Sequence, residues 1–290
     1  MRVLIAYDGS ESADQALELM AGLTWPAAAE CRLVVTCGVP FATSASVMVA
    51  DASTLQAILD APLDDAERLA TAISRRIDRP GLAVTWEVGL GRPASAILDA
   101  EHRFRPDLLV VGSRRVGPIM SAVLGSVSDE LLDRAQCPVL VARGTELRRV
   151  VLAEDGSRDA QAASNLLLRW PVFRGADIRV VGASIGNSRT HPNERAAIDG
   201  QQVAQEALAA VEALVASTAG RLRRAGLSAD TSVREGDPAA EILATAGDWS
   251  ADLITLGSQG QTGLTRQLRG SVARKILEHA PCSVLIERRR

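Results

Sequence analysis

The chain has 290 residues, and at roughly 150 residues per domain its length predicts two domains. Hydrophobic residues make up 47% and aromatic residues only 3%, so we expect the aliphatic core of a parallel sheet covered by Ala-rich helices. The net charge of −3 and the lack of a Lys/Arg run argue against nucleic-acid binding, and no apolar stretch is long enough to span a membrane. The four cysteines show no Cys-x-x-Cys spacing and no signal peptide is apparent, which predicts a cytoplasmic protein.

Strands and helices are expected to alternate along the first half of the chain. We predict a strand at 3–6, a helix at 13–23 capped by Ser10 or Ser12, a strand at 32–37 and a long helix at 61–79. After these we predict a strand at 82–88, a helix at 93–101, a strand at 108–112, a helix at 126–134 and a strand at 139–142.

The second half of the chain repeats the first. Asp-Gly-Ser occurs at 8–10 and 155–157, and GRPASAIL at 91–98 matches GDPAAEIL at 236–243. Residues 106–143 and 251–288 align without a gap, with 13 identities at 38 positions. We infer a duplication, with one domain at 1–144 and the other at 148–290. Strands of the second copy are expected near 149–153, 178–183, 229–234, 253–257 and 283–287.

This alternation predicts an α/β fold of two tandem doubly wound domains, each a five-stranded parallel sheet with helices on both faces. In such sheets ligands bind beyond the carboxyl ends of the strands, where the strand order reverses. Candidate binding residues are therefore those that follow the strands.

A glycine-rich turn follows the fourth strand of the second copy. Gly257 and Gly260 allow positive φ angles and a close approach of backbone to a ligand. Gly270 and Ser271 open the last helix, whose N-terminus favours an anion. Asp155, at the end of the first strand, is placed to accept hydrogen bonds from a ribose or a base. This pattern favours a phosphate-binding site, although the same residues also serve in ordinary turns and helix caps.

The first copy has the same frame with one difference. Gly112, Gly125 and Ser126 keep the spacing, but Arg115 stands where the second copy has Gly260. The arginine can obstruct the backbone path or can reach a phosphate with its own charge. Nucleotide binding in the first copy is left open on this ground.

These motifs together resemble a known family across essentially the whole chain. The strand-end Asp-Gly-Ser, the Gly-x-Pro at 91–93 and 236–238, the Gly-x-x-Gly…Gly-Ser signature and the closing Cys-Pro-Val or Cys-Ser-Val are similar to those of a tandem universal stress protein. The resemblance implies a domain like that of the adenine nucleotide alpha hydrolases. Many members bind ATP with the aspartate near adenine or ribose and the glycines around the phosphates, whereas members that lack the glycines do not.

The resemblance also implies the binding residues of both copies. In the second copy they are Asp155, Ala183, Gly257, Gly260, Gly270, Ser271 and Val272. Those of the first copy are Asp8, Cys37, Gly112, Gly125, Ser126 and Val127. Ala183 and Cys37, at the ends of the second strands, are expected to offer backbone groups to the base.

The expected function is that of an ATP-binding stress-response regulator, which acts through a nucleotide-dependent change of conformation or partner. The cofactor is expected to be ATP, with or without Mg²⁺, and the chain is expected to form homodimers. One alternative is an interaction module with degenerate binding sites. The other is an enzyme that hydrolyses ATP slowly, although no Walker lysine motif and no catalytic Ser/His/Asp set can be named. No protein metal site is expected, because no histidine has ligand spacing.

Overall fold

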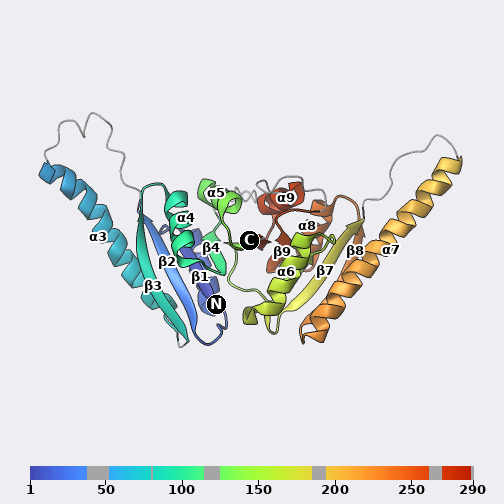
Figure 1. Ribbon diagram of the computed structural model, residues 1–290, viewed down its shortest axis with the longest axis horizontal. Coiled ribbons are helices and arrows are strands. Elements are labelled where there is room, and N and C mark those ends of the chain that lie inside the picture. The colour runs from blue at the N-terminus through green and yellow to red at the C-terminus, as the bar shows by residue number, and fades with distance from the viewer. Residues whose placement is uncertain (38–51, 80, 114–124, 185–193, 261–269, 289–290) are drawn as a thin grey trace. The chain divides into compact units, whose positions relative to one another are not determined.

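The computed structural model describes residues 1–37, 52–79, 81–113, 125–184, 194–260 and 270–288 (Figure 1). The chain divides into two compact units, one holding the first five strands and the other the last five. Each unit is a domain with its own aliphatic core. The core of the first includes Leu4, Leu33 and Leu109, and that of the second includes Leu152, Ile254 and Leu277, all essentially inaccessible to solvent.

The first unit is a five-stranded parallel sheet with helices on both faces. Its strands are β1 (Arg2–Tyr7), β2 (Ala29–Cys37), β3 (Leu82–Leu90), β4 (Leu108–Gly112) and β5 (Val139–Ala142), in the order β3-β2-β1-β4-β5. Helices α1 (Glu11–Gly22) and α3 (Ala52–Ile77) contact each other on one face. Helices α4 (Pro93–Phe104) and α5 (Ser126–Arg134) contact each other on the other face (Figure 1).

The second unit repeats this architecture. Its strands are β6 (Arg149–Ala153), β7 (Asp177–Ser184), β8 (Ser228–Glu235), β9 (Leu253–Gly257) and β10 (Ser283–Glu287), all parallel and in the order β8-β7-β6-β9-β10. Its helices are α6 (Arg158–Arg169), α7 (Glu194–Arg224), α8 (Pro238–Asp248) and α9 (Ser271–His279), with a short 3-10 helix η1 (Pro171–Phe173). The predicted fold class is confirmed for both units.

The main differences from the sequence prediction concern helix ends. Helix α3 begins at Ala52 and not near 61. A proline suits a first helical turn, so Pro62 favours a late start, but Leu55 and Gln56 before it have high helix propensity. Helix α4 continues beyond 101 to Phe104, where Arg105 takes the left-handed cap conformation (φ 49°) and donates its N–H to the carbonyl of Glu101. Phe104 is buried under the guanidinium of Arg2, 4.4 Å from its ring centroid, so tertiary packing extends this helix.

The strand order places a ligand crevice in each unit. The order reverses between β1 and β4 in the first unit and between β6 and β9 in the second. The carboxyl ends of these parallel neighbours meet at one edge of the sheet. There Asp8 follows β1 and Gly112 ends β4, or Asp155 lies just beyond β6 and Gly257 ends β9. This edge is where doubly wound sheets bind ligands.

One buried hydroxyl in the second sheet predicts a stabilising substitution. Thr255 in β9 is inaccessible to solvent, and its Oγ1 has no hydrogen-bond partner among the described residues. Thr255→Val keeps the shape and removes the unsatisfied group, so we expect the free energy of unfolding of this domain to rise by about 1 kcal/mol. Amide hydrogen exchange in β9 and β6 measures the change.

Thr245→Val is the matched control for this change. Thr245 is also buried, but its Oγ1 donates to the carbonyl of Glu241 at 2.8 Å. The valine removes a made hydrogen bond here, so this variant should gain no stability. Equal gains in both variants would contradict the explanation.

Candidate nucleotide site

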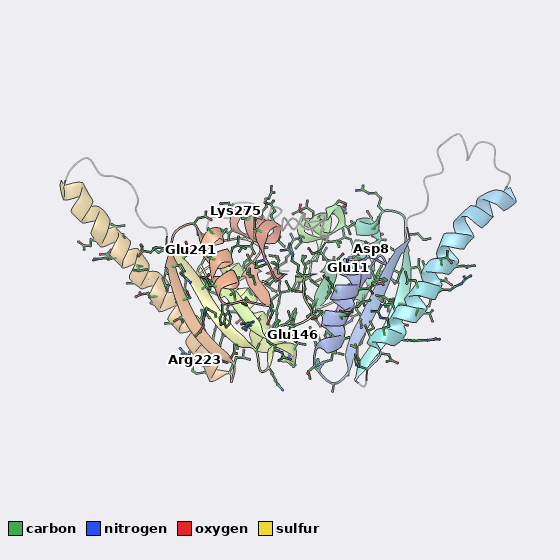
Figure 2. The ribbon with its side chains drawn as sticks, turned by 180° about the vertical axis from the view of Figure 1, so that it is seen from behind. Asp8, Glu11, Glu146, Arg223, Glu241 and Lys275 are labelled. Carbon is green, nitrogen blue, oxygen red and sulfur yellow. The ribbon has the colours of Figure 1, made fainter. Side chains whose placement is uncertain are left out.

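The Asp-Gly-Ser motif forms the same turn in both domains. Asp8 Oδ1 accepts the N–H of Ser10 at 3.1 Å, and Asp155 Oδ1 accepts the N–H of Ser157 at 2.9 Å. The glycine between them takes φ +77° or +78°, a conformation that side chains disfavour. Each serine then caps the following helix, and Figure 2 shows Asp8 close to Glu11 at the start of α1. The motif therefore fixes where the strand-end carboxylate lies.

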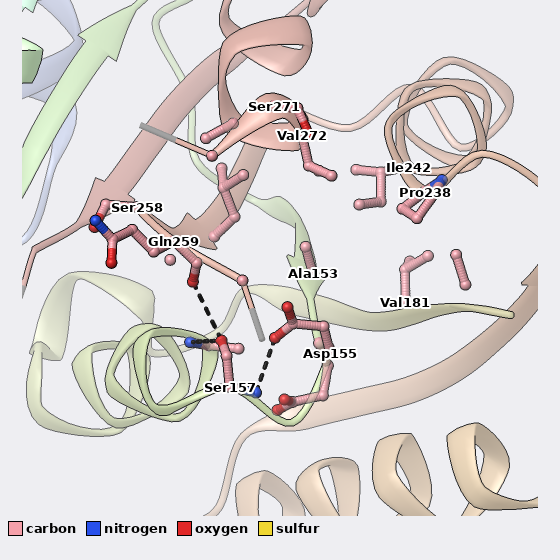
Figure 3. A pocket seen from close by; sticks show the side chains of 18 residues that line it. Ala153, Asp155, Ser157, Val181, Pro238, Ile242, Ser258, Gln259, Ser271 and Val272 are labelled. Carbon is pink, nitrogen blue, oxygen red and sulfur yellow. Dashed lines mark hydrogen bonds between the residues drawn. The ribbon is translucent and has the colours of Figure 1, made fainter. Parts of the chain in front are cut away.

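A cavity of about 180 Å³ lies at the carboxyl ends of β6, β7 and β9 in the second domain. All seven residues predicted for this domain line it: Asp155, Ala183, Gly257, Gly260, Gly270, Ser271 and Val272. One wall is apolar and includes Val181, Pro238 and Ile242, whereas the other is formed by the glycine-rich turn and the start of α9 (Figure 3). Such a cavity suits a ligand with an apolar part and an anionic part.

The glycines do not use the positive φ angles that the sequence allows them. None of Gly257, Gly260 and Gly270 has a positive φ, so conformational freedom does not explain them. A Cβ on Gly257 would lie 2.5 Å from Asp159 Cβ and 2.6 Å from its backbone carbon. A Cβ on Gly260 would lie 2.8 Å from Asp155 Oδ2. Gly257 is thus required for packing against α6, while Gly260 leaves room beside the aspartate.

The N-terminus of α9 opens onto the cavity. Its cap residue Gly270 makes no side-chain capping bond and donates its own N–H to the carbonyl of Ser258 at 2.9 Å. The next three residues, Ser271, Val272 and Ala273, all line the cavity, and N–H groups in a first turn have no acceptor within their own helix. These amides and the positive end of the helix dipole favour an anion.

The first domain places its candidate residues at equivalent positions. Asp8 follows β1, Cys37 ends β2 and Gly112 ends β4, so all three lie at the same edge of the sheet. Gly125 caps α5, which begins with Ser126 and Val127. Arg115, on which the prediction for this copy depended, lies outside the described residues. Nucleotide binding by the first domain therefore stays a prediction.

A family assignment follows from comparison with known proteins. The family model described as "Universal stress protein family" matches residues 1–143 and again residues 146–288. The chain belongs to the universal stress protein family. The two matches cover nearly all of the chain, so it is a tandem universal stress protein, as the sequence motifs indicated.

Individual relatives agree with this assignment. A universal stress protein of Mycolicibacterium smegmatis is 27% identical over 220 residues, which cover 72% of this chain and 70% of the relative. The crystal structure of a universal stress protein from Archaeoglobus fulgidus matches with a TM-score of 0.68 at 19% identity, over 100% of this chain and 98% of the other. It shows the shared fold. A universal stress protein family protein of Arabidopsis thaliana was solved with AMP bound; it is 16% identical over 49% of this chain and 92% of its own, with a TM-score of 0.36.

Sequence reasoning missed a buried carboxyl beside the cavity of this universal stress protein. Glu154 is only 4% exposed and precedes Asp155. Its Oε1 accepts the N–H of Gly156 at 2.9 Å, and its Oε2 accepts the hydroxyl of Thr218 on α7 at 2.9 Å. The repeat alignment contained one signal for this position, because the first copy has the uncharged Tyr7 where the second copy has Glu154. Only the fold, however, reveals that α7 supplies a partner.

Burial raises the pKa of the Glu154 carboxyl above its ordinary value of 4.5. The charge of Asp155 acts in the same direction, against the hydrogen bonds from Gly156 and Thr218 and the positive charge of Arg221. The folded domain therefore binds this proton more tightly than the unfolded chain does. The proton's contribution to the free energy of unfolding is fully present below about pH 4.5 and is lost as pH rises through the raised pKa.

Glu154→Gln tests this pH dependence. The amide keeps an acceptor for Gly156 and a polar group for Thr218 but does not titrate. We expect the stability of the variant to fall less steeply above pH 4.5 than that of the wild type, because residue 154 no longer titrates. Hydrogen exchange of β6 amides between pH 5 and pH 8, corrected for intrinsic exchange, measures it. Parallel profiles for the variant and the wild type would contradict the assignment.

No helix among the described residues is long and apolar enough to cross a membrane. Within the same residues, no three His, Cys, Asp or Glu side chains gather as ligands for a metal ion.

Proposed function

We propose that the second domain binds an adenine nucleotide, with ATP as the expected ligand. The observation that carries the proposal is the cavity itself, where an acidic strand end, a glycine-rich turn and an open helix N-terminus lie around one space. The base packs against the apolar wall of Val181, Pro238 and Ile242. The ribose lies near Asp155, and the phosphates lie at the start of α9.

The charges of the lining agree with phosphates at this end. Glu154 and Asp155 follow β6 and line the cavity, whereas Ser271, at the start of α9, lies on the side opposite Asp155 (Figure 3). Neither Lys nor Arg occurs among the described residues of the lining. The helix N-terminus is therefore the anion-binding feature, and a Mg²⁺ ion carried with the phosphates would add positive charge.

Nucleotide binding suits a regulatory role better than an enzymatic one. The described lining offers a place to hold a nucleotide. Glu154 is the lining residue with a raised pKa, but its two carboxyl oxygens already accept hydrogen bonds from Gly156 and Thr218, which does not favour it as the base of a fast reaction. We propose that bound ATP changes the conformation or the partner affinity of the chain during a stress response. Membership of the family favours a homodimer in the cytoplasm as the working form, which light scattering and fractionation can check.

Calorimetric titration of the purified chain with ATP, ADP and AMP tests the binding proposal. We expect saturable binding, with one or two sites per chain according to whether the first domain also binds. Native mass spectrometry of the protein as purified would reveal a retained nucleotide. If no adenine nucleotide binds at millimolar concentration, the proposal fails and an interaction module is the better explanation. Turnover near a median enzyme rate, on the order of 10 s⁻¹, would instead establish an enzyme.

A further inference from the structure

The glycine-rich turn of the second domain is attached to the first turn of α6. Asp159 Oδ2 accepts the hydroxyl of Ser258 at 2.8 Å and the backbone N–H of Gln259 at 3.1 Å. Ser157 donates its hydroxyl to the carbonyl of Gln259 at 3.3 Å (Figure 3). Both polar backbone groups of Gln259 are thus bonded to the residues that open α6.

Both backbone polar groups of Ser258, at the start of the turn, are also bonded. The N–H of Ser258 donates to the carbonyl of Glu287 in β10 at 3.0 Å, and its carbonyl accepts the N–H of Gly270 at 2.9 Å. The absence of a side chain on Gly257 permits this arrangement, because a Cβ there would overlap Asp159. Ser258, Gln259 and Gly260 line the cavity, so these bonds set the path of the backbone that faces the ligand.

The first domain is bonded differently at the equivalent positions. Ser12 occupies the place of Asp159, and its hydroxyl bonds to that of Ser10 at 3.0 Å. Ser113, the equivalent of Ser258, accepts the Nε–H of Arg143 at 3.2 Å. A short serine in α1 thus replaces the carboxylate that, in the second domain, accepts two hydrogen bonds from the turn.

We propose that Asp159 is a positioning residue for the phosphate side of the second nucleotide site, an inference that rests on the proposed function. Its carboxylate holds the backbone of the turn in the conformation that faces the ligand before the ligand binds. The free energy of binding is therefore not reduced by the entropy cost of ordering the turn. The N-terminal end of α6 stabilises its negative charge, and two donors already occupy the oxygen that faces the turn. The ligand class this favours is a nucleotide with phosphate at α9, as opposed to a bare nucleoside.

The test compares phosphorylated and unphosphorylated ligands. In Asp159→Ala, we expect the ratio of ATP affinity to adenosine affinity to fall about tenfold, equivalent to about 1.4 kcal/mol. Adenosine affinity itself should stay within about twofold, since the apolar wall is untouched. A purely structural role would lower both affinities together. Calorimetry with ATP, AMP and adenosine gives the three constants.

Two further measurements accompany this comparison. Ser258→Ala removes one of the two bonds to Asp159 and should give a smaller fall in the same ratio. Ser12→Ala is the matched control in the first domain and should leave the ratio unchanged. Without ligand, the Gln259 amide should be protected from hydrogen exchange in the wild type and exposed in Asp159→Ala.

The outcomes separate this inference from the proposed function. If the wild type binds no adenine nucleotide, the proposed function is wrong and the assignment of Asp159 to a phosphate site falls with it. If the wild type binds ATP and Asp159→Ala keeps the wild-type ratio, the positioning role alone is overturned. An equal loss of ATP and adenosine affinity would likewise overturn it in favour of a general structural role.

Discussion

Replacing Gly257 by alanine should lower the free energy of unfolding of the second domain by about 3 kcal/mol, the upper end of typical overpacking costs. The new Cβ would lie 2.5 Å from Asp159 Cβ, 2.6 Å from the Asp159 backbone carbon and 2.9 Å from the Ala160 nitrogen. Two of these three atoms belong to the backbone of α6, so no side-chain rotation relieves the overlap. Either the helix moves away from β9 or the strand end shifts.

A glycine-to-alanine substitution inside a helix should instead raise the free energy of unfolding. Gly220 lies inside α7, and an added Cβ there meets nothing within 4 Å. Gly220→Ala should therefore stabilise the domain by roughly 0.5–1 kcal/mol through helix propensity. Hydrogen exchange of the buried β6 and β9 amides reports both changes. A Gly257→Ala domain as stable as the wild type would show that α6 is not held as closely as described.

Gly260→Asp should reduce ATP affinity of the second domain at least about 100-fold, equivalent to about 2.7 kcal/mol. The Cβ of the new side chain would lie 2.8 Å from Asp155 Oδ2, and its carboxylate would add negative charge between Asp155 and Gly270, the cap of the helix where we propose that the phosphates lie. Steric overlap and like-charge repulsion act together against the ligand. Titration of the variant with ATP measures the effect.

Gly144→Asp controls for the added charge. Gly144 is not among the lining residues, and a Cβ there meets nothing within 4 Å. This variant should bind ATP as the wild type does. If Gly260→Asp retains wild-type affinity, the phosphates do not lie beside Gly260 and the proposed orientation of the ligand is incorrect. If one of two sites survives in Gly260→Asp, the remaining site belongs to the first domain.

The proposed binding site is formed by residues from separate motifs, and no short motif contains all of them. Asp155 is far from Gly260 and Ser271 in the sequence, yet all three line one cavity because β6 and β9 are neighbours. Duplication made Asp155 and Ser271 recognisable in advance, since the motifs that contain them occur twice at nearly constant offset, whereas Gly260 is matched by Arg115 in the first copy. Their parallel strands then bring them to a common edge.

The sequence by itself determined the fold class, the duplication and most elements. Strands at 108–112 and 139–142 and the helix at 126–134 have the predicted bounds, because continuous aliphatic runs and a Gly-Ser cap are local signals. Helix ends that depend on packing were less predictable. Phe104 extends α4 because its ring is buried under Arg2, a contact between residues distant in the sequence.

Only the tertiary structure decided what the glycines and the carboxylate of Asp159 do. Gly257 was expected to serve backbone freedom near a ligand, but its φ is ordinary and α6 fills the space of its missing side chain. In the sequence Asp159 is an acidic residue in a predicted first helical turn, which is a common feature that does not indicate a contact with Gln259. It contacts Gln259 because β9 ends directly against α6, and such proximity between residues 100 positions apart arises from the packing of helix on sheet.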